Sequence, residues 1–204
     1  MDSTSTPAVV LAAGYSRRLG RPKALVDING KELVRWIHER LDSVGCRPVV
    51  VVVNAEIKSD VENLLPEAYL VVNPNPDAGR TGSLQLGIEA LAAVMDSDPE
   101  RLVMAPVDRP GWNIEVLQAL LEHKGDSAPF HDGRKGHPVL LSSPAIQVVQ
   151  KAESHLPLRD LVMFKPVAVA APWLNLNIDT ENDVSLLESN DAALLACFSQ
   201  GEGI

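Results

Sequence analysis

Apolar and polar residues alternate along this chain in blocks, and the blocks predict strands and helices in turn. Short apolar runs rich in β-branched residues predict buried strands at 9–12, 48–53, 69–72, 101–105, 127–130, 138–141 and 167–171. Apolar residues at helical spacing predict helices at 33–44, 59–65, 83–94, 113–123, 143–151 and 181–198. Because strand and helix alternate, we expect an α/β fold around a mostly parallel sheet.

Capping signals indicate where three of these helices begin. Asn29 and Glu32 have the spacing of a capping box in front of the first helix. Ser83 follows a loop rich in Pro and Gly, and one interpretation is that this loop is a long turn with Ser83 as the N-cap of the third helix. Thr180 and Asp183 are expected to cap the last helix in the same way.

The composition describes a globular chain of one domain. With 204 residues, of which 46% are hydrophobic and 22% charged, we expect a single domain over 1–204, with the polar residues 1–7 disordered. The net charge is -9, from 18 Lys and Arg against 27 Asp and Glu. This acidic balance argues against nucleic acid or an anionic membrane as a partner.

Targeting and cysteine signals point to the cytoplasm. The first fourteen residues hold no Lys or Arg, and no run approaches the roughly 20 apolar residues of a membrane-spanning helix. Cys46 and Cys197 lie far apart and outside any metal-binding spacing. We therefore expect a cytoplasmic enzyme with reduced thiols, and neither a disulfide framework nor a structural zinc site.

The most informative stretch follows the first predicted strand. The small residues Ala12, Ala13 and Gly14 would let a phosphate approach the backbone amides. A cluster of cations comes next, which suits a polyanion because such side chains donate charge-assisted hydrogen bonds: Arg17, Arg18, Arg21 and Lys23. Neither a P-loop nor the dinucleotide-binding fingerprint fits the spacing of the glycines, so the sequence predicts a different kind of phosphate loop.

Polar residues also follow other predicted strands at their carboxyl ends, where open α/β sheets bind ligands. Asp108 follows the strand at 101–105 and is placed to hold a divalent cation against the phosphates; the alternative is that it caps or pairs with Arg109. Asn54 and Asn73 follow two neighbouring strands and are candidates for contacts to the base or the ribose.

The stretch LAAGYSRRLGRPK, from Leu11 to Lys23, resembles the LAAGxSxRxGxxK signature of the MobA-like nucleotidyltransferases. Within that family it is similar to the molybdenum cofactor cytidylyltransferases. Further stretches follow the order of the family's motifs, at 71–88, 105–110, 133–144 and 177–184. The resemblance implies a three-layer α/β/α Rossmann-like nucleotidyltransferase fold of the GT-A-like type.

The resemblance also implies roles for individual residues. Mg²⁺ would be held by Asp108 and Asp179, although Asp179 could instead only cap the last helix. Arg18, Lys23 and Asp108 would be the catalytic residues. The nucleotide would be bound by Leu11, Ala12, Ala13, Gly14, Arg18, Lys23 and Ser83, with Arg80 as a possible further anion contact; the alternative is that the loop before Ser83 is only a long turn.

The acceptor side is implied by a second motif. Gly136, His137 and Pro138 would border the acceptor, with His137 either a base or an ordinary polar loop residue. Many relatives carry a glycine-containing turn where this chain has AESHLPLRDL at 152–161. The two glycines are absent there, so the resemblance does not extend to this part of the acceptor site, while Arg159 could still occupy the arginine position.

Together these features predict transfer of CMP from CTP to the phosphate of the molybdenum-bound pterin cofactor, with release of pyrophosphate. A molybdoenzyme that receives the finished cofactor would be a further partner. Two alternatives keep the chemistry and change the substrate: a guanylyltransferase on the same cofactor and a sugar-phosphate nucleotidyltransferase. Another is a binding protein that delivers the cofactor without turnover.

Overall fold

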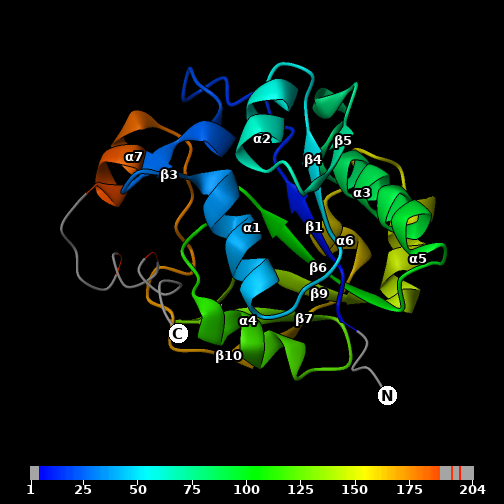
Figure 1. The fold of residues 1–204 in the computed structure, drawn as a ribbon. Coiled ribbons are helices and arrows are strands. Elements are labelled where there is room, and N and C mark those ends of the chain that lie inside the picture. The colour runs from blue at the N-terminus through cyan, green and yellow to red at the C-terminus, as the bar shows by residue number, and fades with distance from the viewer. Residues whose placement is uncertain (1–4, 189–193, 195–197, 199–204) are drawn as a thin grey trace.

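A mixed sheet forms the centre of the molecule, with helices on both of its faces (Figure 1). This computed structural model describes residues 5–188 together with Leu194 and Phe198. The strands of the sheet are β1 (Ala8–Leu11), β4 (Val49–Val53), β5 (Tyr69–Val72), β6 (Arg101–Pro106), β7 (Ser127–His131), β8 (Arg134–Lys135), β9 (Val139–Ser142) and β10 (Lys165–Ala168). A separate hairpin consists of β2 (Asp27–Ile28) and β3 (Lys31–Glu32).

The strand order is β10-β7-β9-β6-β1-β4-β5, and β8 pairs with β7 outside this path. The neighbours β5, β4, β1 and β6 run parallel to one another, as do β7 and β10. Strand β9 lies antiparallel between β6 and β7. The prediction of an α/β fold around a mostly parallel sheet is therefore confirmed.

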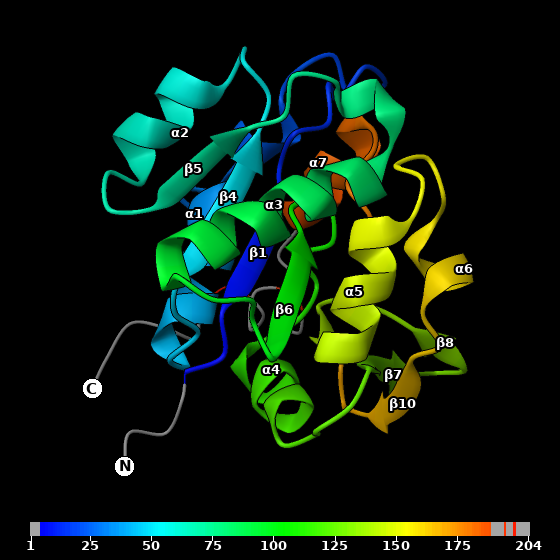
Figure 2. The ribbon, with the colours of Figure 1, turned by 90° about the vertical axis from the view of Figure 1, so that its right-hand side faces the viewer.

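Helices cover both faces of this sheet. They are α1 (Leu33–Ser43), α2 (Lys58–Leu64), α3 (Arg80–Met95), α4 (Ile114–Leu121), α5 (Ser143–Lys151), α6 (Leu158–Leu161) and α7 (Glu181–Leu187), with short 3-10 turns at Lys23–Leu25 and Pro76–Ala78. Figure 2 shows α3 and α5 over one face of the sheet. Helices α1, α2, α4 and α7 contribute to the apolar core on the other face. The three-layer α/β/α arrangement is thus confirmed.

The sequence of β4 shows why both faces must be covered. Its five residues are all valine and all buried. Val49, Val51 and Val53 belong to one apolar cluster, and Val50 and Val52 belong to the other. Because successive side chains of a strand point to opposite faces, a run of valines needs a helix layer on each side.

The predicted capping box in front of α1 is wrong. Asn29 and Gly30 have positive φ angles of 55° and 80° and form the turn between β2 and β3. An Asn-Gly pair strongly favours such a hairpin turn. Glu32 is the N-cap residue of α1 and makes no capping hydrogen bond with its side chain.

The predicted N-cap of α3 is also wrong. The helix begins at Arg80, and Ser83 is buried within its first turn. Gly79 is the N-cap residue, with a φ of 117° that favours glycine. The glycine between the loop and the helix, rather than the first hydroxyl after it, therefore sets where α3 begins.

The ends of the chain differ from the predictions in part. Within 1–7, which was expected to be disordered, Thr6 and Pro7 are buried, and the Pro7 carbonyl accepts a hydrogen bond from the Val103 amide. The strand predicted at 167–171 lies at Lys165–Ala168 instead. Thr180 and Asp183 form the predicted capping box of α7. The predicted continuation of that helix to 198 lies mostly outside the described residues.

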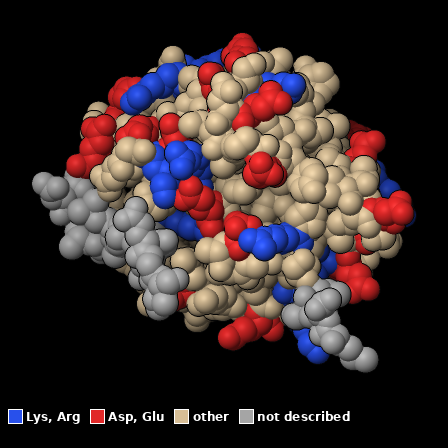
Figure 3. All heavy atoms as spheres, viewed as in Figure 1, with Lys and Arg blue, Asp and Glu red and all other residues tan. Residues whose placement is uncertain are grey.

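Across the described residues, no helix has both the length and the apolar character needed to cross a membrane. On the face shown in Figure 3, the described Lys and Arg side chains are interspersed with Asp and Glu rather than gathered into one basic area.

Candidate functional site

The carboxyl ends of β1 and β6 meet where the phosphate loop begins. Leu11 pairs with Pro106 in the register of the two strands, and the Val107 amide donates a hydrogen bond of 3.0 Å to the Leu11 carbonyl. The Ile178 amide donates to the Asp108 carbonyl at 2.9 Å. Segments far apart in the sequence are thereby brought to one edge of the sheet.

Internal hydrogen bonds turn the phosphate loop back on itself. Ser16, which has a φ of 53°, accepts hydrogen bonds at its carbonyl from the amides of Leu19 and Gly20. Its hydroxyl accepts one from the Lys23 amide at 3.0 Å. These contacts return the chain toward the sheet, and Lys23 reaches the edge where Asp108 lies. Ser16 was not singled out from the sequence, because its partner lies seven residues further along.

A cavity of about 260 Å³, called here the phosphate-loop cavity, lies between this loop and the strand ends. It is lined by Leu11, Ala12, Ala13, Gly14, Ser16, Arg18, Pro22, Lys23, Ala24, Pro76, Arg80, Ser83, Pro106, Val107, Asp108, Arg109, Asn177 and Asp179. A Cβ added to Gly14 would meet no atom within 4 Å, so this part of the loop faces open space. The described structure brings nearly all the predicted nucleotide contacts to one cavity.

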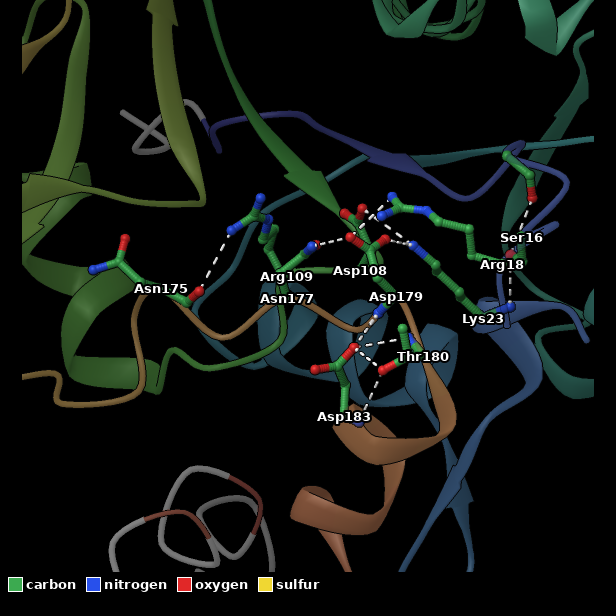
Figure 4. A network of polar contacts seen from close by, with 11 residues as sticks. Ser16, Arg18, Lys23, Asp108, Arg109, Asn175, Asn177, Asp179, Thr180 and Asp183 are labelled. Atoms are coloured by element: carbon green, nitrogen blue, oxygen red, sulfur yellow. Dashed lines mark hydrogen bonds and ion pairs between the residues drawn. The ribbon is translucent and has the colours of Figure 1, made fainter. Parts of the chain in front are cut away.

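An ion-pair cluster lies in the wall of this cavity (Figure 4). The Lys23 Nζ atom lies 2.5 Å from Asp179 Oδ1 and 3.7 Å from Asp108 Oδ2. Arg18 contacts the other oxygen of Asp179 at 3.0 Å, and Asn177 donates to that same oxygen. The side chains of Lys23, Asp108 and Asp179 are only 13%, 20% and 18% exposed, so solvent screens their charges incompletely.

The protonation of Asp179 follows from its surroundings. Burial alone would raise the pKa of Asp179, but the hydrogen bond and the charge of Lys23 outweigh it. The hydrogen bond from Asn177 and the charge of Arg18 act in the same direction, so the pKa lies below its ordinary value. Asp179 is therefore a carboxylate at neutral pH, and its side chain does not cap α7; Thr180 does.

The residues fit a divalent cation that is also bound by phosphates. Mg²⁺ commonly takes one or two carboxylates and completes its shell with water and substrate phosphates. Asp108 and Asp179 supply the carboxylates, and the buried Asn177 Oδ1 has no hydrogen-bond partner. In the described part of the chain, no three His, Cys, Asp or Glu side chains gather as a metal-binding group. The donor set fits an ion shared with a substrate better than one held by protein alone.

The four cations of the loop separate in the structure. Arg18 and Lys23 line the phosphate-loop cavity. Arg17 pairs with Asp77, and Arg21 forms two hydrogen bonds to Glu181, all at exposed positions outside the cavity lining.

Two predicted nucleotide contacts lie outside the cavity lining and support a residue of the site through hydrogen bonds. Asn54 is buried, donates to the Ala13 carbonyl at 3.0 Å and accepts from the amides of Glu56 and Ile57. Asn73 is also buried and donates to the Ser83 hydroxyl at 2.9 Å. Asn54 and Asn73 do not line the cavity, whereas Ser83 does. The two asparagines therefore hold the phosphate loop and Ser83 in place through hydrogen bonds from outside the cavity lining, and we do not retain them as contacts to base or ribose.

A second cavity of about 910 Å³, called here the acceptor cavity, adjoins the first. Gly136 and His137 line it as predicted, but Pro138 does not. Burial first, and then the charges of Arg109 and Arg80, lower the pKa of His137 to about 4, while Asp108 acts in the opposite direction. The ring is neutral at pH 7, and its buried Nδ1 has no hydrogen-bond partner.

The segment 152–161, which lacks the expected glycines, packs on the first turns of α3. The Gly82 amide donates to the Ser154 carbonyl at 3.2 Å, and the Thr81 hydroxyl donates to the Leu156 carbonyl at 2.5 Å. A Cβ on Gly79 would lie 2.6 Å from the Ser154 carbonyl oxygen. The close approach therefore uses glycines of α3 in place of glycines in the segment, a role that the sequence pattern did not reveal.

Arg109 was expected at most to pair with Asp108. Instead, its Nη1 contacts the Asn175 carbonyl at 3.4 Å, and its buried Nε has no hydrogen-bond partner. It lines both cavities. The only sequence signal for this position is its place just beyond a strand's carboxyl end.

An α/β sheet whose first strand opens into a cationic loop, opposite two carboxylates, defines a nucleotidyltransferase-type site. Residues 8–169 match the model of the MobA-like NTP transferase domain, and the chain belongs to this family. The family-level resemblance inferred from the motifs is therefore confirmed.

Individual relatives carry different activities. Nicotine blue oxidoreductase from Paenarthrobacter nicotinovorans is 31% identical over 157 residues, covering 70% of this chain and 75% of that protein. Molybdenum cofactor guanylyltransferase from Xanthomonas euvesicatoria is 34% identical over 113 residues, covering 55% of this chain and 52% of the relative. The 2-C-methyl-D-erythritol 4-phosphate cytidylyltransferase from Bifidobacterium longum is 35% identical over 111 residues, covering 50% of this chain and 38% of the relative. The matched part of the chain spans about half or less of the last two relatives.

Solved structures share the fold. Rv0371c from Mycobacterium tuberculosis superposes with a TM-score of 0.75 at 24% identity, over 93% of this chain and 100% of that one. A structure of the same protein in complex with manganese has a TM-score of 0.71 at 22% identity, over 91% of this chain and 100% of that one.

Proposed function

We propose that this chain is a metal-dependent nucleotidyltransferase that transfers CMP from CTP to the phosphate of the molybdenum-bound pterin cofactor. The observation that carries the proposal is Lys23, held between Asp108 and Asp179 on a phosphate-loop cavity that adjoins a larger one. Mg²⁺ is the ion that we expect in the cell. We also propose that residues 1–204 act as one domain in the cytoplasm, where CTP is available.

The reaction needs alignment and charge neutralisation more than a covalent nucleophile. An oxygen of the acceptor phosphate attacks the α-phosphorus of CTP, a new P–O bond forms, and the bond to the β-phosphate breaks, so that pyrophosphate leaves. The backbone at Ala12–Gly14 would hold the phosphates, and Arg18 and Lys23 would neutralise their charge. A divalent ion held by Asp108 and Asp179 supplies further charge neutralisation when it is bound.

Lys23 has two tasks in this scheme. In the free protein its ammonium compensates the two carboxylates, which would otherwise repel each other at low exposure. With a divalent ion held by Asp108 and Asp179, Lys23 would be free to contact the phosphates of CTP.

The choice of substrates rests on the relatives and the motifs. One curated relative is named a cytidylyltransferase and another a molybdenum cofactor guanylyltransferase. The LAAG and GHPVLLSSP stretches are more similar to the cytidylyl branch. A guanylyltransferase on the same cofactor and a sugar-phosphate nucleotidyltransferase are the neighbouring alternatives.

A second candidate function comes from a relative that matches over most of this chain. Nicotine blue oxidoreductase matches 70% of this chain, so an oxidoreductase is a specific alternative. Failure of every nucleoside triphosphate to bind, with and without the metal ion, would favour this function.

The test is a thermal-shift panel of the purified protein with CTP, GTP, UTP and ATP, each with and without Mg²⁺ or Mn²⁺. A ligand at about 100 times its Kd stabilises the fold by roughly 2.7 kcal/mol. We expect a metal-dependent rise with CTP, followed by pyrophosphate release when the molybdenum-bound pterin is added. Selectivity for another nucleotide would replace CTP in the proposal.

Two variants sharpen the test. Asp108→Asn should lose the metal-dependent part of the shift while it keeps the fold, because one of the two carboxylate ligands is gone. Asp77→Asn is the matched control, since Asp77 is 58% exposed and pairs with Arg17 outside the cavity lining. CTP binding without any pyrophosphate release would instead favour a protein that delivers the cofactor to a molybdoenzyme.

A further inference from the structure

The segment that carries Asp108 continues into a buried turn. Pro110, Gly111 and Trp112 are all buried, and the Trp112 side chain is completely excluded from solvent. Within the turn, the Trp112 amide donates to the Pro110 carbonyl at 2.8 Å. Buried carbonyl groups need hydrogen-bond donors, and proline supplies none from its own backbone. The turn therefore depends on groups from other segments to fix its position.

Arg40 of helix α1 is one source of these donors. Its Nη1 atom donates to the Trp112 carbonyl at 2.7 Å and to the Pro110 carbonyl at 3.0 Å. The residue is only 2% exposed, which is rare for an arginine unless it serves as a partner for buried groups. Because the donor is charged, these hydrogen bonds are stronger than those between neutral groups. Arg40 thus joins α1 to the turn that follows Asp108.

Three aromatic rings contact the guanidinium group of Arg40. Its Cζ atom lies 4.9 Å from the centre of the Phe198 ring, 5.3 Å from that of Trp112 and 5.6 Å from that of Trp36. Phe198 is 2% exposed and meets Trp36 edge to face, with 5.6 Å between the ring centres. Since cation–π contacts are stronger when they are desolvated, the rings hold the guanidinium group in place. Phe198 thereby helps to fix a donor that lies far away from it in the sequence.

The same turn packs against the segment that leads to Asp179. The Ile178 amide donates to the Asp108 carbonyl at 2.9 Å. A Cβ added to Gly111 would overlap the Trp173 carbonyl oxygen, so no side chain fits there. The backbones that carry the two carboxylates of the ion-pair cluster are therefore in direct contact, and a shift of the turn would change the distance between the carboxylates.

We propose that Arg40 is a positioning residue of the site: through the carbonyls of Pro110 and Trp112 it sets the backbone that presents Asp108 to the metal ion. This inference rests on the proposed function, in which Asp108 is one of the two carboxylate ligands. Arg40 lines neither cavity, so it acts through Asp108 and not on the substrates. Residues that support metal ligands in this way commonly contribute about 10–100-fold to metal affinity or activity.

The first measurement is hydrogen exchange, followed by mass spectrometry, on wild type, Arg40→Lys and Phe198→Leu without any ligand. Lysine keeps the charge but lacks the planar group that stacks on the rings, and leucine keeps apolar volume but offers no ring face to the cation. In Arg40→Lys we expect the amides of Arg109, Trp112 and Ile178 to exchange about tenfold faster, because local opening breaks fewer charged hydrogen bonds. Phe198→Leu should show a smaller increase.

The second measurement is calorimetry with α,β-methylene-CTP, which cannot transfer its nucleotide. With this analogue bound, Arg40→Lys should raise the Kd of Mn²⁺ by about 10–100-fold. The Kd of the analogue without metal should stay within about twofold of wild type, because the phosphate loop and Arg18 would still hold its phosphates. In steady-state kinetics, the KM for Mg²⁺ should rise more than kcat falls at saturating metal. A residue that only stabilises the fold would leave these binding constants unchanged.

Val149→Ala is the matched control. Val149 is fully buried in the apolar cluster on the other face of the sheet and lines neither cavity. The variant should destabilise the fold through lost packing. It should nevertheless leave the Kd of Mn²⁺ as in wild type, together with the exchange of the three amides relative to those of β4.

The inference is wrong if Arg40→Lys leaves the exchange of these amides and the Kd of Mn²⁺ unchanged. It is also wrong if the variant weakens the CTP analogue equally with and without metal, since Arg40 would then not act through Asp108. Should Arg40→Lys fail to fold, Phe198→Leu carries the same two measurements. Faster exchange in Arg40→Lys, together with no nucleotide binding by wild type, would contradict the proposed function and leave the positioning of the turn by Arg40 standing.

Discussion

The Lys23 side chain connects the phosphate loop to the two carboxylates at the carboxyl edge of the sheet. This side chain is 13% exposed, and its ammonium contacts both carboxylates that we assign to the metal. Removing it would leave two partly buried carboxylates to repel each other, and their interaction is stronger than at a fully exposed position. Lys23 therefore contributes both to the stability of the free protein and to the binding of phosphates.

We predict that Lys23→Ala lowers kcat/KM for CTP by about 10²–10³, the usual effect of losing one charged donor at a reacting centre. The melting temperature should fall without metal and recover in part with Mg²⁺, which replaces the missing positive charge. Steady-state kinetics and thermal unfolding measure the two effects. Lys58→Ala is the control, because Lys58 is exposed, lines neither cavity and pairs with Glu62. Near-normal kinetics for Lys23→Ala would refute the assignment.

His137 should make the stability depend on pH. Its pKa is about 4 in the folded protein against 6.5 ordinarily, mainly because of burial. Above pH 6.5 both states hold a neutral ring, so the contribution of His137 is fully present. As the pH falls below 6.5 the unfolded chain binds a proton first, and stability is lost progressively until the pH reaches the folded pKa.

We predict that urea unfolding of wild type loses more free energy between pH 7 and pH 5 than unfolding of His137→Gln. The difference should be at most about 2 kcal/mol, because each unit of pKa shift corresponds to about 1.4 kcal/mol. His123→Gln, at an exposed position, should behave as wild type. Equal pH dependence of wild type and His137→Gln would show that the ring is solvated.

Helix α3 is the element that connects the parts of the site. Its first residue, Arg80, stands between the two cavities, and its first turns hold the segment 152–161 through Thr81 and Gly82. Further along, Gly87 packs directly on β1 and β4. A Cβ at Gly87 would lie 2.4 Å from a methyl group of Val9 and 3.1 Å from one of Val52.

We predict that Gly87→Ala destabilises the protein by about 1–3 kcal/mol, even though alanine is the better helix former by about 1 kcal/mol. The valines cannot move aside easily because β-branched side chains are stiff. Urea unfolding at equilibrium measures the change. Gly125→Ala is the matched control, since a Cβ there meets nothing within 4 Å, and it should change stability little. A stabilised Gly87→Ala would show that α3 can shift away from the sheet.

At the scale of the whole molecule, two apolar cores lie on the two faces of the same strands. Val10 and Val51 belong to one core and Val9 and Val50 to the other, so neighbouring residues of β1 and β4 serve both. Losing either core would expose one face of every central strand. The two layers should therefore unfold together, as expected of one domain.

We predict one cooperative unfolding transition in urea, with the same midpoint by far-UV circular dichroism and by tryptophan fluorescence. The fluorescence reports on the three tryptophans of the chain, of which Trp112 lies in one apolar core and Trp36 and Trp173 pack against it. Saturating CTP with Mg²⁺ should move both midpoints equally. Two separated transitions would contradict a single domain.

Local sequence was enough for most of the elements. The valine run of β4, the strand at Tyr69–Val72 and the helix at Ser143–Lys151 were predicted at or within one residue of their ends. Each of these is determined by the periodicity of its own side chains or by a proline at a helix start. The starts of α1 and α3 were not predicted correctly. Asn29 and Gly30 form the turn between β2 and β3 in place of a cap for α1, and Gly79, with its positive φ, is the N-cap of α3 in place of Ser83.

The sequence by itself determined the alternating α/β order, the cationic loop after β1 and, through resemblance, the carboxylates of Asp108 and Asp179. Only the tertiary structure decided which polar residues work together. It paired Lys23 with Asp179 across 156 positions of the chain, turned Arg17 and Arg21 outward and placed Arg80 and Arg109 between the cavities. Periodicity reports on the backbone around each residue, whereas the partner of a side chain is set by how distant segments pack.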